Sequence, residues 1–391
     1  MLPTPRFRHA VYRTLTIFLL AGLALLAVAC RERADIDPAY HEFAYVSNGA
    51  SDSVSVIDTL ALRNVKTIGV GKNPTGVAAN PARNEIYVAN TESNNISIID
   101  AERNEVVATI GVHRAPYFVS VSSDGKRAYV ANSGSWNVSV IDLDKRAVIK
   151  TIPVGNAPGL AKVSPDGSVV AVSNRGANTV SLIDTKKLAV RSTVAVCAQP
   201  QDIVILPDNT KVYVACPGSN QLASIDLKTD RVLALLDIGN LPIHMALKPD
   251  GGEIFVSNFD ANTFSIVEAY TNEASGSYLI GSNPVRGVVT SDNSLLYVSN
   301  FGSDNVSVYA IDEGRVIGSV QVGSHPDGLA LTPSEDHLLV VDTKSGDVAV
   351  VRTVKTRDNS KISADRALVT VIPVGNQPND IVIKAFKSDG K

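Results

Sequence analysis

The amino-acid sequence predicts an all-β fold, an eight-bladed β-propeller of four-stranded antiparallel blades. Three observations predict it: a tetrapeptide of the type Tyr-Val-Ser-Asn recurs every 42 residues, a proline recurs with the same period, and each unit holds four short runs of strand character. Units of about 40 to 45 residues with four strands each are typical of propellers, which contain roughly four to eight blades.

The tetrapeptide marks the same point in eight consecutive units. Its last residues are Asn48, Asn90, Asn132, Asn174, Cys216, Asn258, Asn300 and Asp342. The repeated proline occurs at Pro74, Pro116, Pro158, Pro200, Pro242, Pro284, Pro326 and Pro378. The last interval is 52 residues rather than 42, so we expect an insertion in one loop, at 352–366. Within each unit, Pro-Asp-Gly and Asn-rich turns join the strand-like runs, which favours an antiparallel meander.

The two ends of the repeat region complete each other. The first unit, from Phe43, lacks the strand that follows the proline, and the last segment, Pro378–Lys384, lacks the other three strands. We therefore expect Asp380–Lys384 to form the innermost strand of the blade that begins at Phe43, which would close the ring and remove free sheet edges. A seven-bladed ring with one spare unit is the alternative.

The N-terminus has the pattern of an export signal. Residues 1–14 carry three arginines and no acid, and they precede an apolar run, Leu15–Ala29, that ends at Cys30. The run is shorter than the roughly 20 residues of a membrane-spanning helix, so a secretory signal peptide is favoured over a permanent anchor helix. The small residues before Cys30 resemble the lipobox of bacterial lipoproteins, which implies cleavage after residue 29 and acylation of Cys30.

These features divide the chain into a signal peptide (1–29), a tether (30–42), the propeller (43–385) and a tail (386–391). We expect a lipid-anchored monomer in the bacterial cell envelope, on the periplasmic or cell-surface side. The formal net charge of the 391 residues is −3, and loss of three arginines with the signal peptide makes the mature chain more acidic. An acidic chain argues against a nucleic-acid partner, and three cysteines exclude a disulfide-dense scaffold.

The repeated motifs resemble those of the YVTN-repeat, YncE-like β-propellers of bacteria and archaea. These motifs are Tyr-Val-x-Asn, Asn-x-Val-Ser-Val-Ile-Asp, Val-x-x-Thr-Ile-x-Val-Gly and Pro-x-Gly-x-x-x-x-Pro-Asp-Gly, and they recur over residues 43–385. The resemblance implies a propeller fold and an exported protein, but no defined activity. The family's usual number of blades is seven, so eight units are a departure.

Residues that recur in every unit indicate structural roles, so function is expected where the columns break. The Asn and Asp columns are interpreted as caps of strand ends and turns. We call the face that carries the prolines and the Asn column the top face. Two residues after the proline, four units carry an ionisable group, and neighbouring positions add aromatic and basic residues around a predicted axial funnel. The ligand-binding candidates there are His244, Arg286, Asp202, Asp380, Arg175, His325, Phe259, Phe301, Tyr117, His113 and Arg114.

Two cysteines break the columns of one unit. Cys197 stands where most units have glycine, and Cys216 replaces the asparagine of the same unit. An exported protein favours their oxidation to a disulfide, with two buried free thiols as the alternative. The histidines lie in different units, so no metal site is expected.

The function favoured by these observations is a non-enzymatic platform that binds a protein partner or a small ligand on its top face. Its membrane contact would be the N-terminal lipid, and no cofactor is required. One alternative is a cofactor-handling protein that holds a haem-like anionic group between Arg286, Arg175 and His244. A second alternative is a lyase or hydrolase in which His244 and Asp202 or Asp380 act as acid and base.

Overall fold

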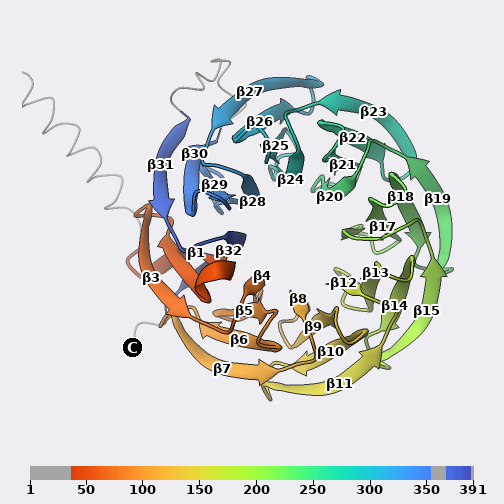
Figure 1. Cartoon of the computed structure of the whole chain (residues 1–391), viewed down its shortest axis with the longest axis horizontal. Coiled ribbons are helices and arrows are strands. Elements are labelled where there is room, and N and C mark those ends of the chain that lie inside the picture. The colour runs from red at the N-terminus through yellow and green to blue at the C-terminus, as the bar shows by residue number, and fades with distance from the viewer. Residues whose placement is uncertain (1–36, 354–366, 389–391) are drawn as a thin grey trace, which may run out of the picture. The chain divides into compact units, whose positions relative to one another are not determined.

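The computed structural model describes residues 37–353 and 367–388 and shows eight four-stranded antiparallel sheets arranged as a ring (Figure 1). Each sheet is one blade, and its strands follow one another from the axis outward. Blade 1 differs, because its innermost strand is the last strand of the chain. The predicted eight-bladed propeller and its closure are therefore confirmed, and the seven-bladed alternative is wrong.

The first four blades each run from an inner strand to an outer strand. Blade 1 contains β32 (Pro378–Lys387), β1 (Tyr40–Asn48), β2 (Ser53–Asp58) and β3 (Arg63–Gly69), with a short 3-10 helix, η1 (Gly49–Ser51). Blade 2 contains β4 (Pro74–Ala79), β5 (Glu85–Asn90), β6 (Asn95–Asp100) and β7 (Glu105–Gly111). Blade 3 contains β8 (Pro116–Val121), β9 (Arg127–Asn132), β10 (Asn137–Asp142) and β11 (Ala147–Pro153). Blade 4 contains β12 (Pro158–Val163), β13 (Val169–Asn174), β14 (Thr179–Asp184) and β15 (Ala189–Ala195).

The other four blades have the same order. Blade 5 contains β16 (Ile203–Ile205), β17 (Lys211–Cys216), β18 (Gln221–Asp226) and β19 (Arg231–Asp237). Blade 6 contains β20 (Pro242–Leu247), β21 (Glu253–Asn258), β22 (Thr263–Glu268) and β23 (Glu273–Leu279). Blade 7 contains β24 (Pro284–Val289), β25 (Leu295–Asn300), β26 (Asn305–Ala310) and β27 (Arg315–Gln321). Blade 8 contains β28 (Pro326–Leu331), β29 (His337–Asp342), β30 (Asp347–Arg352) and β31 (Leu368–Pro373).

Contacts divide the described chain into the propeller, residues 42–384, and a small unit of residues 37–41 and 385–388. In the small unit, the N–H of Ser388 donates to the carbonyl of Ala39. The predicted signal peptide, Cys30, most of the tether, insertion residues 354–366 and the end of the tail lie outside the described residues. Within residues 37–353 and 367–388, no helix is long and apolar enough to cross a membrane.

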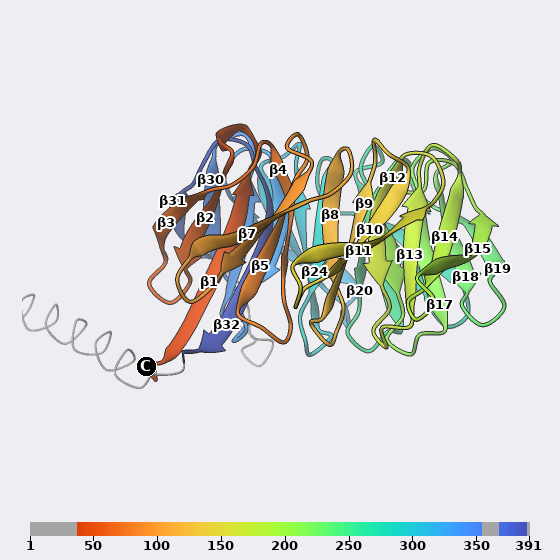
Figure 2. The same cartoon turned by 90° about the horizontal axis from the view of Figure 1, so that it is seen from below.

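The core of the propeller lies between neighbouring blades. Figure 2 shows the ring from the side, with the strands running between its two faces. The second strand of a blade is buried on both sides. In five blades it carries an almost fully buried tyrosine, and these residues are Tyr45, Tyr87, Tyr129, Tyr213 and Tyr297. Each apolar cluster draws on two adjacent blades; one, for example, joins Leu339 and Val348 of blade 8 to Val46 and Ile57 of blade 1. Each blade therefore depends on both of its neighbours to bury its faces.

The Asn column ties the second and third strands of a blade together at the top face. The side-chain amide of Asn90 donates to Asn95 Oδ1 at 2.7 Å and to Ser97 Oγ at 2.9 Å. Residues Asn48, Asn132, Asn174, Asn258 and Asn300 repeat this pattern with partners five and seven positions later. The expectation that these asparagines cap backbone N–H groups is corrected, because their amides donate to side chains of the next strand; Asn48 additionally accepts from the backbone N–H of Gly375.

A glycine of the preceding segment packs directly against this asparagine. A β-carbon at Gly71 would lie 2.8 Å from Cβ of Asn90, and one at Gly155 would lie 2.7 Å from Cβ of Asn174. Real β-carbons do not approach this closely, so the glycine and the asparagine form a matched pair. The Asp column behaves as expected: Asp58 Oδ1, for instance, accepts hydrogen bonds from the N–H groups of Leu60 and Ala61 in its turn.

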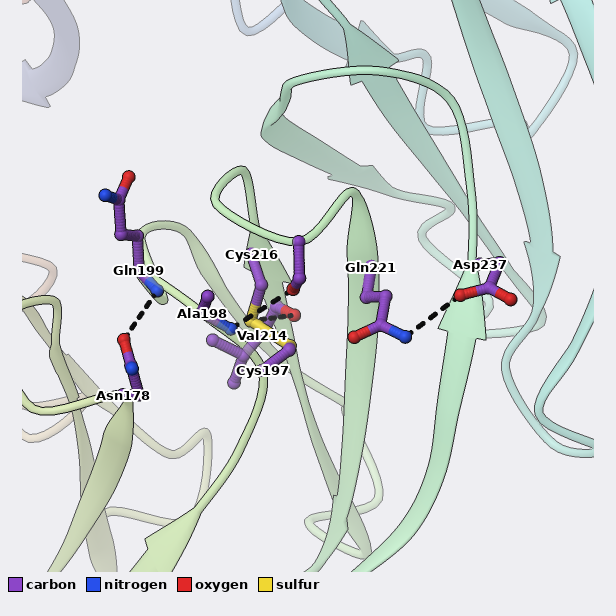
Figure 3. The surroundings of a disulfide bond; sticks show 9 residues. Asn178, Cys197, Ala198, Gln199, Val214, Cys216, Gln221 and Asp237 are labelled. Carbon is purple, nitrogen blue, oxygen red and sulfur yellow. Dashed lines mark hydrogen bonds between the residues drawn. A yellow bond between two sulfur atoms is a disulfide. The ribbon is translucent and has the colours of Figure 1, made fainter.

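Blade 5 replaces the glycine–asparagine pair by a disulfide. Cys197 occupies the glycine position and Cys216 the asparagine position, and the two form a buried disulfide with a Cα–Cα distance of 5.7 Å (Figure 3). Next to it, the N–H of Ala198 donates to Ser219 Oγ and that of Gln199 to Asn178 Oδ1. The covalent bond thus holds the segment that leads to Pro200 and Asp202 against the top of β17.

Blade 8 replaces the asparagine network by two acids. Asp342 takes the place of the asparagine, Asp347 lies five positions later, and Ala349 removes the hydroxyl found seven positions later in other blades. Asp342 is fully buried. Burial, together with the neighbouring carboxyl of Asp347, raises the pKa of Asp342 from 3.8 to about 8. A protonated Asp342 can donate to Asp347, as the amide does in the other blades.

The disulfide predicts a coupled mutational effect. Cys197→Ser should destabilise the propeller by about 3 kcal/mol, because the bond closes a loop of about 20 residues and its loss leaves two polar atoms buried. The double variant C197G/C216N should recover a large part of that loss, because it restores the pair found in other blades. Urea unfolding of the three proteins measures this. Equal stability of the single and double variants would contradict the proposed equivalence of the two pairs.

The acid pair predicts a pH-dependent stability. An acid with a raised folded-state pKa keeps a proton that the unfolded chain releases, so its contribution to the free energy of unfolding is lost as the pH rises from about 4 to about 8. Asp342→Asn should therefore stabilise the propeller by about 1–3 kcal/mol at pH 8 and have little effect near pH 4. Thermal unfolding across this range is the measurement. The converse change, Asn300→Asp in blade 7, should destabilise increasingly with pH.

Candidate functional site

The innermost strands surround a cavity of about 520 Å³ that opens at the top face. Its walls come from blades 3 to 8 and from the loop that follows Asn90 in blade 2. The lining residues are Thr91, Ala115, Tyr117, Phe118, Ser133, Pro158, Gly159, Leu160, Lys162, Arg175, Gln201, Asp202, Ile243, His244, Val285, Arg286 and Asp327. The predicted axial funnel is therefore present as a cavity, and its volume lies in the range typical of small-ligand sites, roughly 300–1,000 Å³.

Residues two positions after the proline link one inner strand to the next. Asp202 Oδ2 accepts a hydrogen bond from the N–H of Met245 in blade 6 at 2.8 Å. Asp380 Oδ2 accepts one from the N–H of Val77 in blade 2 at 3.1 Å, and His244 Nδ1 lies 3.5 Å from its donor, the N–H of Gly287 in blade 7. Asp202, Asp380 and His244 thus each link two neighbouring inner strands, which stabilises the ring.

Arg286 is the fourth residue of that column and is neutralised by two acids. Its Nε donates to Asp327 Oδ1 at 2.9 Å, and its Nη1 lies 3.8 Å from Asp380 Oδ1. Burial by itself would lower the pKa of Arg286, but Asp327 and Asp380 outweigh it and raise that pKa above its usual value. Burial raises the pKa of Asp380, while Arg286 opposes the rise. The charge of Arg286 is therefore balanced within the protein.

His244 lies near Asp202, and its side chain is neutral. Burial lowers the pKa of His244, Asp202 partly opposes this, and Arg286 and Lys162 lower the pKa further. With Nδ1 accepting from Gly287, the ring proton lies on Nε2, which is 3.9 Å from Asp202 Oδ2. Because the side chain is 24% exposed, Nε2–H can donate to a ligand in the cavity.

Two cations on one wall are not neutralised. Lys162 lies on β12 and Arg175 directly follows β13, so both belong to blade 4, and both are exposed where they line the cavity. Neither side chain forms an ion pair with another described residue, in contrast to Arg286. On the neighbouring wall the Tyr117 side chain is 52% exposed. The cavity therefore combines a positive wall with an exposed aromatic ring.

The other predicted candidates do not line this cavity. His113 Nε2 lies 3.1 Å from Thr151 Oγ1 on the outer side of blade 3, and Arg114 is exposed in the same loop. Phe301 and His325 line a separate cleft, and Phe259 lies beside Phe301 with ring centroids 6.3 Å apart. Lys162 was not predicted, although it lies two residues beyond Leu160 and so faces the same side of β12.

No cluster of three or more histidine, cysteine, aspartate or glutamate residues suited to a metal ion occurs in the described part of the chain. In the acid–base pair expected for a lyase or hydrolase, His244 Nε2 lies 3.9 Å from Asp202 Oδ2, which is longer than a hydrogen bond. Asp202 Oδ1 accepts from the N–H of Ile203 and Oδ2 from that of Met245, so both oxygens already have structural partners.

Comparisons with known proteins agree with this architecture. The family model described as "YNCE-like beta-propeller" matches residues 23–166, and the one described as "Lactonase, 7-bladed beta-propeller" matches residues 114–237 and 281–368. The chain is thus a β-propeller with YncE-like repeats, which confirms the resemblance seen in the sequence. It belongs to the lactonase-type propeller family, whose model matches more than half of it, although its ring has eight blades. No curated protein matches the sequence.

Many solved structures share the fold, as three of them illustrate at low sequence identity. Hydrazine synthase of Kuenenia stuttgartiensis is 21% identical, with a TM-score of 0.60 over 72% of this chain and 96% of that one. Dihydro-haem d1 dehydrogenase NirN in complex with DHE is 14% identical, with a TM-score of 0.74 over 87% of this chain and 74% of that one. A functionally unknown protein from Desulfotomaculum acetoxidans is 18% identical, with a TM-score of 0.59 over 87% and 98%. At these identities the likeness shows the fold alone.

The ion pairs of Arg286 predict a pH-dependent loss of stability. Arg286→Met should destabilise the propeller by about 1–2 kcal/mol at pH 8, because Asp327 and Asp380 become unpaired neighbouring carboxylates; the partial exposure of Arg286 keeps the loss small. The loss should shrink at pH 5, where unpaired Asp380 takes up a proton. Urea unfolding at both pH values checks this. Adding Asp380→Asn should restore most of the stability at pH 8, and an unchanged loss at pH 5 would contradict the explanation.

Proposed function

We propose that this protein is a binding protein whose axial cavity takes a small anionic ligand with a flat ring. The observation that carries the proposal is the pair of cations Lys162 and Arg175, which line the cavity without an acidic partner among the described residues. A guanidinium and an ammonium together suit carboxylate or phosphate groups. Leaving two like charges on one wall costs stability unless an anion binds there.

The rest of the cavity supports the same ligand class. The Nε2–H of neutral His244 adds a donor without adding charge, and exposed Tyr117 offers a ring face for stacking. Asp202, Asp327 and Asp380 are engaged by backbone N–H groups or by Arg286, which limits their repulsion of an anion. The ring supplies a rigid support, because every inner strand is held by its neighbours.

A haem-type tetrapyrrole is the specific candidate within this class. Such groups are planar and carry carboxylates, and NirN, which shares the fold, was solved in complex with DHE. In this chain Lys162 and Arg175 would hold the carboxylates, while Tyr117 and His244 would contact the ring. A protein partner on the top face is the alternative for the same surface, and it would not require these two cations in particular. Lipid attachment at Cys30 and a location in the cell envelope are proposals that the sequence of residues 1–30 supports.

Two ligands that share a ring and differ in charge test the proposed function. Mesoporphyrin IX should raise the melting temperature of the protein, since a ligand at 100 times its dissociation constant adds about 2.7 kcal/mol. Its dimethyl ester, which keeps the ring and lacks both charges, should bind at least about tenfold more weakly. Absorbance titration gives both affinities.

Removing the two cations Lys162 and Arg175 should weaken binding in the same way as removing the charges of the ligand. Lys162→Met with Arg175→Met should weaken mesoporphyrin binding at least about tenfold and leave ester binding unchanged. Arg114→Met is the matched control, because it removes a cation from the same face outside the cavity. Equal binding of acid and ester, unaffected by the wall variants, would refute the anionic site. No binding of either compound, nor of citrate or phosphate, would leave the protein-partner alternative.

A further inference from the structure

A second cavity on the top face contains predicted candidates that the axial cavity does not use. Its volume is about 360 Å³, and it lies where the top loops of blades 7 and 8 meet the segment leading into β32. Phe301, His325, Thr343, Lys344, Asn376 and Gln377 line it. None of these residues lines the axial cavity.

At this junction Phe301 lies against a histidine ring, His325, and it also lies beside Phe259 of blade 6. The residue after the Asn column is aromatic only as Phe259 and Phe301, and the residue before the proline is a histidine only as His325. The ring centroids of Phe301 and His325 are 4.3 Å apart, with an angle of 38° between the planes. Among the described residues, these two columns place an aromatic ring against a histidine between blades 7 and 8.

The repeated turn holds His325 in place. The residue before the proline has a positive φ in all eight units, and His325 has a φ of 56°. Its N–H donates to Asp304 Oδ1 at 2.8 Å, and its carbonyl accepts from the N–H of Thr343 at 3.0 Å. Histidine is one of the non-glycine residues that adopt a left-handed backbone most readily, and these two hydrogen bonds fix the backbone that carries the ring.

A cation without an acidic partner lies beside the rings. The position of Lys344 is held by Ala50, Glu92, Gly134, Gly176, Gly218, Asp260 and Gly302 in the other units. The backbone N–H of Lys344 donates to the carbonyl of Ser324, but its ammonium forms no ion pair with another described residue. The hydroxyl of Thr343 is buried and has no hydrogen-bond partner in the described part of the chain. This junction thus offers ring faces and one positive charge.

We propose that the cleft between blades 7 and 8 is a second ligand site, which takes a small aromatic carboxylate. The aromatic ring of the ligand stacks on Phe301 and His325, and its carboxylate binds the ammonium of Lys344. A ring pair alone would accept any apolar ring, and a lysine alone any anion, so the combination selects molecules that have both features. Side-chain amides of Asn376 and Gln377 can donate further hydrogen bonds to the carboxylate.

Four simple compounds separate the two parts of this recognition. Benzoate should bind with a dissociation constant of about 1 mM, as expected for a fragment of this size in a partly open site. Benzamide, which lacks the charge, and cyclohexanecarboxylate, which lacks the aromatic face, should each bind at least about fivefold more weakly than benzoate. 2-Naphthoate should bind more tightly than benzoate because it covers more of the rings. Ligand-observed NMR titration of the full-length protein measures all four.

Variants assign the binding to this cleft. Lys344→Gln and Phe301→Leu should each weaken benzoate binding at least about fivefold, and Lys344→Gln should leave benzamide binding unchanged. Lys72→Gln, at an exposed top-face lysine outside both cavities, is the matched control. Far-ultraviolet circular dichroism and melting temperatures establish that each variant is folded.

The same series keeps the two sites apart. Benzoate binding that survives the cleft variants but is lost in Lys162→Met with Arg175→Met would place the ligand in the axial cavity and overturn the proposal. Absence of saturable benzoate and naphthoate binding up to about 20 mM, far above the expected constant, would also overturn it. Mesoporphyrin binding and its dependence on Lys162 and Arg175 are measured separately, so failure of the cleft proposal can be told apart from failure of the proposed function.

Discussion

Closure of the ring by β32 is the constraint on which the rest of the structure depends. Every blade buries both of its faces against a neighbour, so an open ring would expose two apolar faces and a row of unpaired strand edges. The C-terminal segment prevents this by pairing with β1 and by making polar links on both sides. The N–H of Gly375 donates to Asn48 Oδ1, and the side-chain amide of Asn379 donates to the carbonyl of Pro74. The same strand brings Asp380 to Arg286.

Two exceptions at the glycine–asparagine pair are matched substitutions, whereas His113 takes the glycine position opposite an unchanged Asn132. Where cysteine replaces the glycine, a second cysteine replaces the asparagine it would contact, and the two are bonded. Where aspartate replaces the asparagine in blade 8, the residue five positions later is also an acid, and burial raises the pKa of Asp342 so that its protonated form can donate to Asp347. Both cases preserve a link at the top of the blade. Such changes therefore concern the stability of the platform more than its binding properties.

Charge on the top face is divided between two uses. Asp202 and Asp380 connect neighbouring inner strands, and the charge of Arg286 is paired with that of Asp380. Removing any of these side chains should lower the free energy of unfolding. Lys162, Arg175 and Lys344 have no such partners among the described residues, and they stand on two separate walls. Because unneutralised cations contribute little to folding, they are the residues at which selection for a ligand would act.

The sequence alone determined the architecture, because a strict period of 42 residues can be satisfied only by identical units that pack in the same way. It also pointed to the top face, since the columns break there, and to the cysteine pair. Which of those exceptions meet was decided by the tertiary structure. Asp202 and Asp380 link neighbouring inner strands, and Phe301 and His325 line a cleft that is separate from the axial cavity. Positions in a column share a height on the ring, but loop conformation and the neighbouring blade decide where each side chain points.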